Sequence, residues 1–405
     1  MKYVILVGDG MSDYPLEELG GKTPLQVARK PNMDWLAKNG RCGLLKTIPD
    51  GMPAGSDIAN MSILGYDPRK YSPGGRGPIE AAAMGIEVRP NDLAIRCNII
   101  TGRGGRIEDY SGGKISNEEA KILIGEANRN FGKEGVEFFP GISYRNLLVL
   151  RDCNLKPGDL IFEAPHDHMG EPFEGLLVKG TARGRPIADM LNEFILRSGD
   201  ILDNNAVNVK RVEEGKAPAN RLWFWGAGKP VTMPTLKERF GLSGVVVSGV
   251  DLVKGLGALA GLEIADVPGA TGYLDTDYEG KADAALGALK EKDLAFIHVE
   301  APDEAGHEAL IEEKIKAIEN IDKRLLDRII KGLREEEHKI ALLPDHPTPI
   351  KIRTHASDPV PFVIFSSGDG KDNVEKFDED SVKNGAYGLK EGPELINLLI
   401  NHGPH

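Results

Sequence analysis

Carboxylate and imidazole side chains stand at the ends of several apolar runs in this sequence. The run IALL (340–343) leads through one proline to Asp345 and His346, and the run YVILV (3–7) leads to Asp9. The segments APDEAGHE and RTHASDPVPF carry the same residue types beside two further apolar runs. Carboxylate oxygens and imidazole nitrogens are ligands for divalent cations, and two sets of them suit two ions of the Mn, Zn or Mg type. The candidate ligands are Asp9, Asp303, His307, Asp345, His346 and His355.

A serine joins this set. Ser56 follows a Pro/Gly turn in MPAGSDIANM and begins a helical pattern. Each candidate also has an ordinary structural explanation: aspartate and proline favour turns, an i,i+4 pair can lie in solvent, and serine is a common helix N-cap. The joint placement of His307, His346 and His355 beside strand ends favours a site over these separate explanations.

Alternating strand and helix patterns predict the scaffold. Such alternation is typical of a mostly parallel sheet flanked by helices, an α/β fold. In open parallel sheets, ligands bind at the C-terminal edge of the strands, where the candidate residues fall. The expected strands are 3–7, 244–250, 293–303, 339–346 and 360–368, and the expected helices include 32–40, 282–291 and 312–337.

The chain is too long for a single hydrophobic core. It has 405 residues. The texture of the sequence, meaning its succession of apolar runs, helical patterns and glycines, changes near 88 and near 230. Between these two positions, Gly-rich connections separate a strand candidate (144–150) from a helical pattern (117–131). We therefore expect two domains, with boundaries near these two positions.

Composition excludes several classes of partner. A formal net charge of −12 without a basic run argues against nucleic acid. The most apolar later stretch (244–263) contains Asp251 and Lys254, which argues against a membrane span. Cys42, Cys97 and Cys153 are typical of reduced thiols and predict a cytoplasmic protein. Neither GGKTP nor GAGKP meets the P-loop pattern, which argues against a nucleotide site of that type. The sequence leaves open whether the protein forms a homo-oligomer.

The motifs in their order resemble one family over essentially the whole chain. These motifs are VGDGMSDYPLEELGGKTPLQVARKPNMDWLA, PAGSDIANMSILGYDP, GRGPIEAAAMG, PDEAGHE, PDHPTP and HASDPVPF. The sequence resembles the archaeal-type, cofactor-independent phosphoglycerate mutases of the alkaline phosphatase superfamily. The resemblance implies an alkaline-phosphatase-like, metal-binding domain in two parts, 1–88 and 231–405. A smaller α+β domain with a substrate-binding or transferase role, 89–230, would be inserted between them, which agrees with the change of texture.

The resemblance also implies the chemistry: interconversion of 3-phosphoglycerate and 2-phosphoglycerate by two-metal phosphoryl transfer through a phosphoserine. A serine hydroxyl is a poor nucleophile at neutral pH, and coordination to a divalent cation lowers its pKa. Backbone N–H groups at a helix start also face phosphoryl oxygens. Carried over by motif, one metal would be held by Asp303, His307 and His355, and the other by Asp9, Asp345, His346 and the nucleophile Ser56.

A phosphorylated hydroxy-acid substrate needs cationic partners. Candidates are Arg76, Arg96 and Arg145, of which the last two stand in or beside apolar runs and need an anionic partner, either structural or ligand. His166 lies in APHDHMGEP, where the mutases have a Pro-His pair. A polar surface loop explains the neighbouring Asp167 and His168 equally well.

Departures from the mutase pattern concern residues expected near the substrate. Glu300 replaces a lysine of the family, which predicts a residue that selects the substrate by charge or, alternatively, one that pairs with a nearby Lys or Arg. Such changes occur in bacterial relatives proposed to be homoserine kinases, so a kinase is the alternative to the mutase. A catalytically silent metal-binding protein is a further alternative, which a trapped phosphoserine would exclude. The other departures are Asn60 in place of His, and Tyr110, Ser111 and Lys114 at positions where the mutases have Arg.

Overall fold

The computed structural model describes residues 1–156, 158–230, 232–368 and 370–400. The chain divides into two compact units: unit 1 consists of Met1–Ser72 with Met233–His405, and unit 2 of Pro73–Thr232. The texture change near residue 88 falls later than the start of unit 2. The reason is that α5 (Gly77–Ala83) packs on β3 and β9 of unit 2, although the composition of this segment resembles what precedes it.

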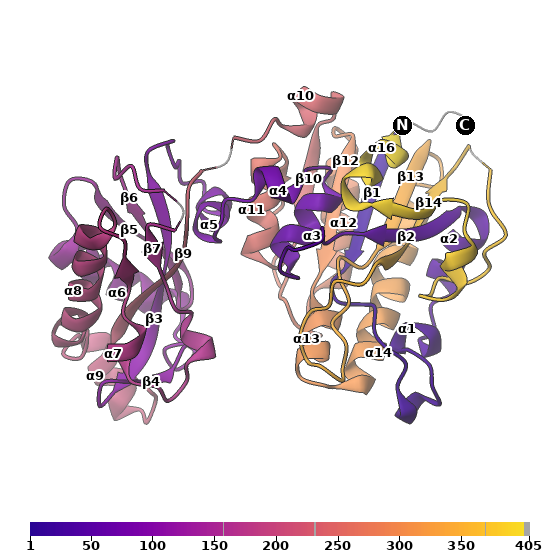
Figure 1. The fold of residues 1–405 in the computed structure, drawn as a ribbon. Helices are drawn as coiled ribbons and strands as arrows, with labels where there is room; N and C mark the ends of the chain where they lie inside the picture. The colour runs from indigo at the N-terminus through magenta and orange to yellow at the C-terminus, as the bar shows by residue number, and fades with distance from the viewer. Residues whose placement is uncertain (157, 231, 369, 401–405) are drawn as a thin grey trace. The chain divides into compact units, whose positions relative to one another are not determined.

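Unit 1 is built on an eight-stranded sheet with the order β11-β10-β12-β1-β13-β14-β2-β15 (Figure 1). Neighbouring strands from β11 to β13 are all parallel, whereas β14 runs antiparallel to both β13 and β2. The predicted mostly parallel α/β sheet is therefore confirmed. Its strands are β1 (Lys2–Gly8), β2 (Arg41–Lys46), β10 (Gly244–Val247), β11 (Glu263–Ile264), β12 (Leu294–Val299), β13 (His338–Leu343), β14 (Val360–Ser366) and β15 (Gly388–Glu391).

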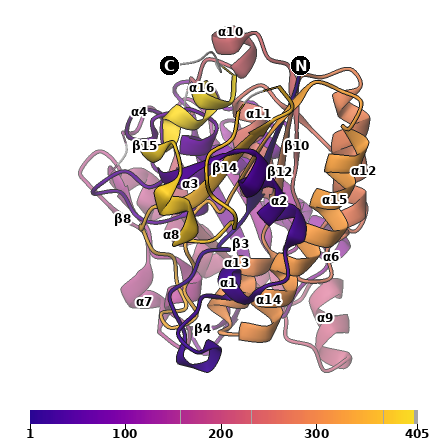
Figure 2. The ribbon, with the colours of Figure 1, turned by 90° about the vertical axis from the view of Figure 1, so that its right-hand side faces the viewer.

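Helices cover both faces of this sheet, with α12 and α15 on one side and α3 and α16 on the other (Figure 2). One apolar core joins alternate residues of the central strands, such as Val4 and Leu6, to Tyr278 and Ala282 of α12. The helices of unit 1 are α1 (Pro24–Val27), α2 (Pro31–Asn39), α3 (Ser56–Ile63), α4 (Pro68–Tyr71), α10 (Leu236–Phe240), α11 (Asp251–Leu259), α12 (Tyr278–Leu289), α13 (Ala301–His307), α14 (Ile311–Asn320), α15 (Asp327–Gly332) and α16 (Leu395–Ile400).

Two sequence-based expectations need correction. The strand expected over 293–303 ends at Val299, because α13 begins at Ala301 with Pro302 in its first turn, which places Asp303 and His307 on this helix. The single long helix expected over 312–337 is α14, a π-helical turn (Ile321–Leu326) and α15, which ends at Gly332. β14 is antiparallel to β13 because no helix separates the two strands to carry the chain back to the starting edge.

Unit 2 is an α+β structure with antiparallel strands in the order β4-β3-β6-β5. A further strand, β9, also pairs with β3 in the antiparallel direction. Its core includes the buried aromatic residues Trp223 and Phe224. Its main elements are β3 (Leu93–Arg103), β4 (Arg106–Asp109), α6 (Asn117–Phe131), β5 (Val136–Ile142), β6 (Arg145–Leu150), β7 (Leu160–Ile161), α7 (Phe173–Leu176), β8 (Lys179–Gly180), α8 (Arg185–Leu202), α9 (Ala206–Glu213) and β9 (Arg221–Gly228).

No helix among the described residues of either unit has the length and apolar character needed to cross a membrane.

Candidate functional site

Three neighbouring strands bring the candidate ligands of unit 1 to one edge of the sheet. β12, β1 and β13 are adjacent and parallel, with Gly8 beside Val299 and Val7 beside Leu343. Parallel strands in this register end together, so the residues that follow them converge. Asp9 follows β1, Glu300 follows β12, and Asp345 lies two residues beyond β13.

The first group of side chains surrounds Asp303. The Nε2 atom of His307 lies 3.2 Å from Asp303 Oδ2, and that of His355 lies 3.6 Å from Asp303 Oδ1. Both imidazoles have Nδ1 beside a backbone carbonyl, that of Arg353 at 3.0 Å and that of Ala54 at 3.3 Å. A carbonyl oxygen only accepts hydrogen bonds, so each Nδ1 carries a proton and each Nε2 faces the carboxylate.

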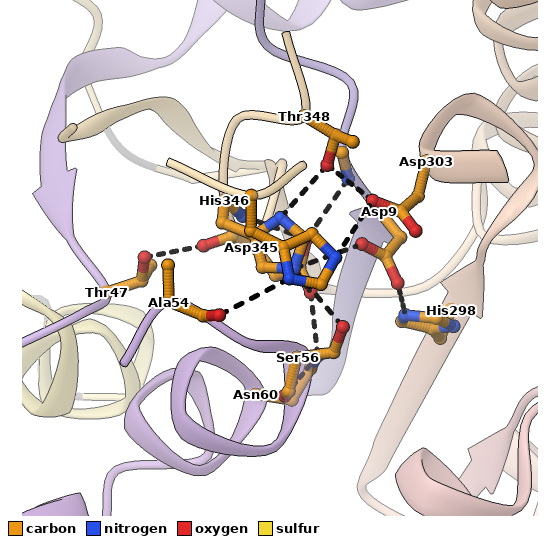
Figure 3. Close-up of polar contacts among 12 residues, drawn as sticks. Asp9, Thr47, Ala54, Ser56, Asn60, His298, Asp303, Asp345, His346 and Thr348 are labelled. Atoms are coloured by element: carbon orange, nitrogen blue, oxygen red, sulfur yellow. Dashed lines mark hydrogen bonds and ion pairs between the residues drawn. The ribbon is translucent and has the colours of Figure 1, made fainter. Parts of the chain in front are cut away.

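The second group consists of the half-buried Ser56 and of the buried Asp9 and Asp345 around a buried His346 (Figure 3). The Nε2 atom of His346 lies 3.2 Å from Ser56 Oγ, 3.5 Å from Asp345 Oδ2 and 3.6 Å from Asp9 Oδ1. Oδ1 of Asp9 is buried and accepts no hydrogen bond from the described residues. The ligand atoms of Asp9, Asp345 and His346 all lie within 4.8 Å of one another, and the same holds for Asp303, His346 and His355. His346 therefore stands between the two groups.

Ser56 is the first residue of α3, not its N-cap. The N-cap is Gly55, which has no side chain to cap the helix, and the amide of Ile58 in the first turn donates to the Gly55 carbonyl at 3.1 Å. The Ser56 hydroxyl lies beside His346 instead. One turn later, Asn60 Nδ2 donates to Asp345 Oδ2 at 2.9 Å and to the carbonyl of Ser56 at 2.9 Å, which ties the helix start to the end of β13.

His298 on β12 is a buried neighbour of this site that the sequence analysis did not select. Its Nε2 lies 2.9 Å from Asp9 Oδ2, and its Nδ1 lies 3.3 Å from the hydroxyl of Ser248. Burial lowers the pKa of His298 to about 4, so the ring is neutral and carries one proton. A carboxylate can only accept, so that proton is on Nε2, and the Ser248 hydroxyl donates to Nδ1. This arrangement holds Oδ2 of Asp9 and leaves Oδ1 facing His346.

Negative charge accumulates at this edge of the sheet. Burial raises the pKa of Asp9 well above its usual range, and the charges of Asp345, Asp303 and Glu300 add to the effect. Burial also opposes ionisation of Asp303, but hydrogen bonds with His307 and His355 hold its pKa well below its usual range. Crowded buried carboxylates require compensating positive charge. The local electrostatics therefore favour cation binding.

Glu300 has neighbours on two sides. Its carboxylate forms a third close group with Asp9 and His298, whose ligand atoms lie within 4.8 Å of one another. It also lies near Lys281, a wholly buried lysine of α12. Burial lowers the pKa of Lys281 to about 8, and the charge of Glu300 opposes that fall. The charges of Lys281 and Glu300 thus act on each other, but pairing with a lysine and substrate selection by Glu300 both stay predictions.

In unit 2, Arg96 has a structural partner. Its guanidinium pairs with Glu80 through two contacts, Nε to Oε2 at 3.0 Å and Nη2 to Oε1 at 2.9 Å, and lies 4.5 Å from the centre of the Trp225 ring. Burial lowers the pKa of Arg96, and the charge of Glu80 opposes this. The anionic partner expected for this buried arginine is therefore Glu80.

Further cationic groups of unit 2 lie around the same place. The charges of Arg76 and Arg145 also depress the pKa of Arg96, while burial lowers that of His166 with a further contribution from Arg76. The His166 ring lies 5.1 Å from that of Trp225. His168, by contrast, lies between two glutamates at 3.3 Å each, which agrees with a polar surface loop.

Comparison with known proteins identifies the family. A family model described as 2,3-bisphosphoglycerate-independent phosphoglycerate mutase matches residues 37–208. The chain is 50% identical over 403 residues to the mutase of that name from Methanosarcina barkeri, covering 99% of each chain. It belongs to this mutase family. A relative from Geobacter sulfurreducens, named a probable mutase of the same kind, is 46% identical and is covered in full.

Two solved structures agree with this membership in the mutase family. The PH0037 protein of Pyrococcus horikoshii matches with a TM-score of 0.82 and 30% identity, covering 100% of this chain and 99% of that one. The cofactor-independent phosphoglycerate mutase of Thermoplasma acidophilum matches with a TM-score of 0.66 and 29% identity, covering 98% of each. The resemblance inferred from the sequence motifs is confirmed.

The donor set in this member of the mutase family fits divalent cations. The Nε2 atoms of His307 and His355 lie 3.0 Å apart although both Nδ1 atoms are donors. Two lone pairs at that separation repel each other unless a proton or a cation lies between them. In the second group, Oδ1 of Asp9 is buried, accepts no hydrogen bond from the described residues and faces His346. Carboxylates and imidazoles in this mixture suit Mn²⁺ or Zn²⁺ better than Ca²⁺.

Two polar residues of the site escaped the sequence analysis. His298 lies inside an apolar strand, and an imidazole there requires a buried partner, which is a signal that the sequence offered. Thr348 stands between Pro347 and Pro349 and resembles an ordinary turn residue. Its hydroxyl nevertheless contacts Asp303 Oδ1 and lies 3.3 Å from His346 Nδ1 (Figure 3).

Proposed function

We propose that the protein interconverts 3-phosphoglycerate and 2-phosphoglycerate through a phosphorylated Ser56. The observation that carries this proposal is the position of the Ser56 hydroxyl, 3.2 Å from His346 Nε2 and at the open start of α3. The names of full-length relatives at 50% identity support the same reaction. The phosphoryl group moves to Ser56, the glycerate reorients, and the phosphoryl group returns to the other hydroxyl.

The residues of unit 1 have separate tasks in this reaction. Ser56 supplies the attacking oxygen, and the N-terminal end of α3 stabilises the negative charge of the phosphoryl oxygens. Asn60 keeps the helix start against Asp345. His298 holds Asp9 in a fixed orientation by its hydrogen bond to Oδ2. Each of these contributions depends on groups that are already in place before substrate binds.

We propose the carried-over ligand sets for two divalent cations. Asp303, His307 and His355 would hold one, and Asp9, Asp345, His346 and Ser56 the other. When bound, the two cations lower the pKa of the serine hydroxyl and stabilise charge on the attacking and leaving oxygens. Their electrostatic fit is supported by the crowding of buried carboxylates at this edge.

Positive charge for the substrate carboxylate and phosphate is proposed to come from Arg76 and Arg145, with His166 as a neutral hydrogen-bonding residue beside them. Arg96 lies in the same cluster, but its charge is neutralised by Glu80, so we propose that it positions its neighbours. The homoserine kinase alternative depends on Glu300. The names of the relatives favour the mutase, and the proximity of Lys281 gives Glu300 a partner within the protein.

The test is to trap the phosphorylated serine. Protein loaded with Mn²⁺ is mixed with 3-phosphoglycerate, quenched in acid, and digested for mass spectrometry. We expect phosphate on Ser56 in the wild type. Ser56→Ala should lose both the phosphopeptide and turnover, while its free energy of unfolding changes by no more than about 1 kcal/mol, because Ser56 does not cap the helix.

Ser62 provides a matched control on the same helix. Its hydroxyl is buried and lies away from the His346 group, so Ser62→Ala should keep the phosphopeptide and turnover. Turnover by Ser56→Ala at the wild-type rate would contradict the covalent route. The same experiment with homoserine and ATP, followed by phosphorus NMR, tests the kinase alternative. Chelation of divalent cations should abolish either activity.

A further inference from the structure

Lys314, on α14, is a buried lysine whose ammonium group has three acceptors. Its side chain is 0% exposed. Nζ donates to Asp13 Oδ2 at 2.6 Å, to the carbonyl of Thr348 at 2.8 Å and to the carbonyl of Ser12 at 3.3 Å. An ammonium has three N–H donors, so these acceptors satisfy it. They belong to two loops that carry proposed ligands. The loop after β1 carries Asp9, and the loop after β13 carries Asp345, His346 and His355.

Asp13 links the same two loops from the opposite side. Its carboxylate accepts hydrogen bonds from the amide of Tyr14 at 2.7 Å and from the amide of Ile350 at 3.2 Å. The Thr348 amide donates to the Ser12 carbonyl at 3.3 Å. The Lys314–Asp13 ion pair therefore joins the loop after β1 to the loop after β13 at several backbone points.

Thr348 connects this ion pair to the candidate ligands. Its hydroxyl donates to Asp303 Oδ1, which is a carboxylate and only accepts. The hydroxyl oxygen then accepts from Nδ1 of His346 at 3.3 Å, which leaves the Nε2 lone pair of His346 facing Ser56 and Asp9. Thr348 thus fixes a carboxylate of one group and the tautomer of the imidazole in the other.

The packing around Thr348 leaves it little room to move. A Cβ atom at Gly10 would come within 2.6 Å of the Thr348 hydroxyl, and one at Gly306 within 2.5 Å of its carbonyl. The backbone of α13 and of the loop after β1 therefore approaches Thr348 closely. A shift of the Thr348 carbonyl at Lys314 would displace the hydroxyl at the other end of the same residue.

We propose that Lys314 is a positioning residue for the metal centre and acts through Thr348 on Asp303 and His346. This role is additional to the proposed ligand sets. It rests on the proposed function, because it requires that Asp303 and His346 hold metal. Among the described residues, the hydrogen bonds of Lys314 go to Ser12, Asp13 and Thr348 and to no proposed ligand side chain, although its charge also acts on Asp303. Supporting residues of this kind change metal affinity by about 10- to 100-fold when removed.

The experiment is a double-mutant cycle read by Mn²⁺ binding. Affinity and stoichiometry are measured by calorimetry and by electron paramagnetic resonance for the wild type, Lys314→Met, Thr348→Val and the double variant. We expect each single change to weaken Mn²⁺ binding about 10- to 100-fold. The double variant should bind no more weakly than the weaker single variant, because both changes interrupt one connection. Fully additive losses would overturn the connection through Thr348.

Lys30 provides a matched control. It is also a buried lysine, 3% exposed, and pairs with Asp34 at 2.8 Å without touching either ligand-bearing loop. Lys30→Met should lower the melting temperature and leave Mn²⁺ affinity unchanged. A loss of affinity equal to that of Lys314→Met would show a general effect of destabilisation and overturn the proposal.

The outcomes separate this inference from the proposed function. A wild-type protein that binds no Mn²⁺ contradicts the proposed metal centre itself. A wild type that binds two ions, with Lys314→Met equally tight, overturns only the role of Lys314. If Lys314→Met does not fold, Asp13→Asn keeps the side-chain volume and removes the charged partner. The inference then predicts weaker Mn²⁺ binding for Asp13→Asn, and unchanged binding overturns it.

Discussion

Replacement of His298 tests whether its hydrogen bond orients Asp9. Asparagine places an acceptor near the position of Nδ1, so His298→Asn can keep the contact with Ser248 but loses the one to Asp9. Glutamine places a donor near Nε2, so His298→Gln does the opposite. The two variants therefore test the two contacts of the buried ring separately: the contact with Ser248 at 3.3 Å and the contact with Asp9 at 2.9 Å.

The expected magnitude follows from the contact that is lost. A hydrogen bond to a charged group contributes about 1.5–3 kcal/mol. His298→Asn should therefore reduce the free energy of unfolding by about 2 kcal/mol. It should weaken Mn²⁺ binding by about 10- to 100-fold, which corresponds to about 1.4–2.7 kcal/mol. His298→Gln should retain most of the affinity, because its amide can still donate to Asp9 Oδ2.

Urea denaturation of the metal-free proteins measures stability, and Mn²⁺ titration measures affinity. Ser248→Ala serves as the control, since it removes the more distant contact and should cost only about 1 kcal/mol of stability. Wild-type Mn²⁺ affinity in His298→Asn would refute the idea that His298 orients Asp9. Equal losses in the asparagine and glutamine variants would show that only the ring volume matters.

Four further outcomes are expected. Asp303 raises the pKa of His307 to about 9 in the metal-free protein, so cation binding must displace a proton and affinity should rise up to about tenfold per pH unit until pH 9. In the metal-free protein the same pair stabilises the fold below about pH 6.5 and loses that effect as the pH rises toward 9, as urea denaturation at several pH values would show. Arg96→Ala should lower the free energy of unfolding by about 3–5 kcal/mol, because it removes the cationic partner of the buried carboxylate of Glu80, whereas an apolar double replacement should cost less; similar losses would contradict this account. Glu300→Lys should lower the KM for 3-phosphoglycerate by reversing a charge worth about 4 kcal/mol at ~4 Å, and an unchanged KM in a coupled assay would show that Glu300 serves Lys281 instead.

The strand ends of unit 1 could be predicted because local patterns determine them. Apolar runs that stop at Asp9 and at Asp345 mark the edge of the sheet without knowledge of the strand order. The helix that carries Asp303 was missed because Pro302 resembles the end of a strand, whereas it is an N-terminal helix residue here. Proline suits both positions, so the sequence alone does not separate them.

The supporting contacts could not be predicted, because their partners are distant in the sequence. His298 and Asp9 are 289 residues apart, and Lys314 and Asp13 are 301 apart. Local spacing places Lys314 on a helix but does not show that its ammonium lies inside the protein. The partner of Arg96 was open for the same reason: Glu80 stands on α5, in a segment that the change of texture assigned to the other domain.

The insertion of unit 2 has a consequence for synthesis of the chain. β1 leaves the ribosome early, but both strands that flank it, β12 and β13, are made only after the whole of unit 2. Unit 2 is one contiguous segment, so all its strand partners are present once residue 232 has been added. Asp9 must therefore await residues 345 and 346 before it meets its neighbours in the second group. Such non-local pairing slows folding, and the nascent first 72 residues are a point at which chaperones can act.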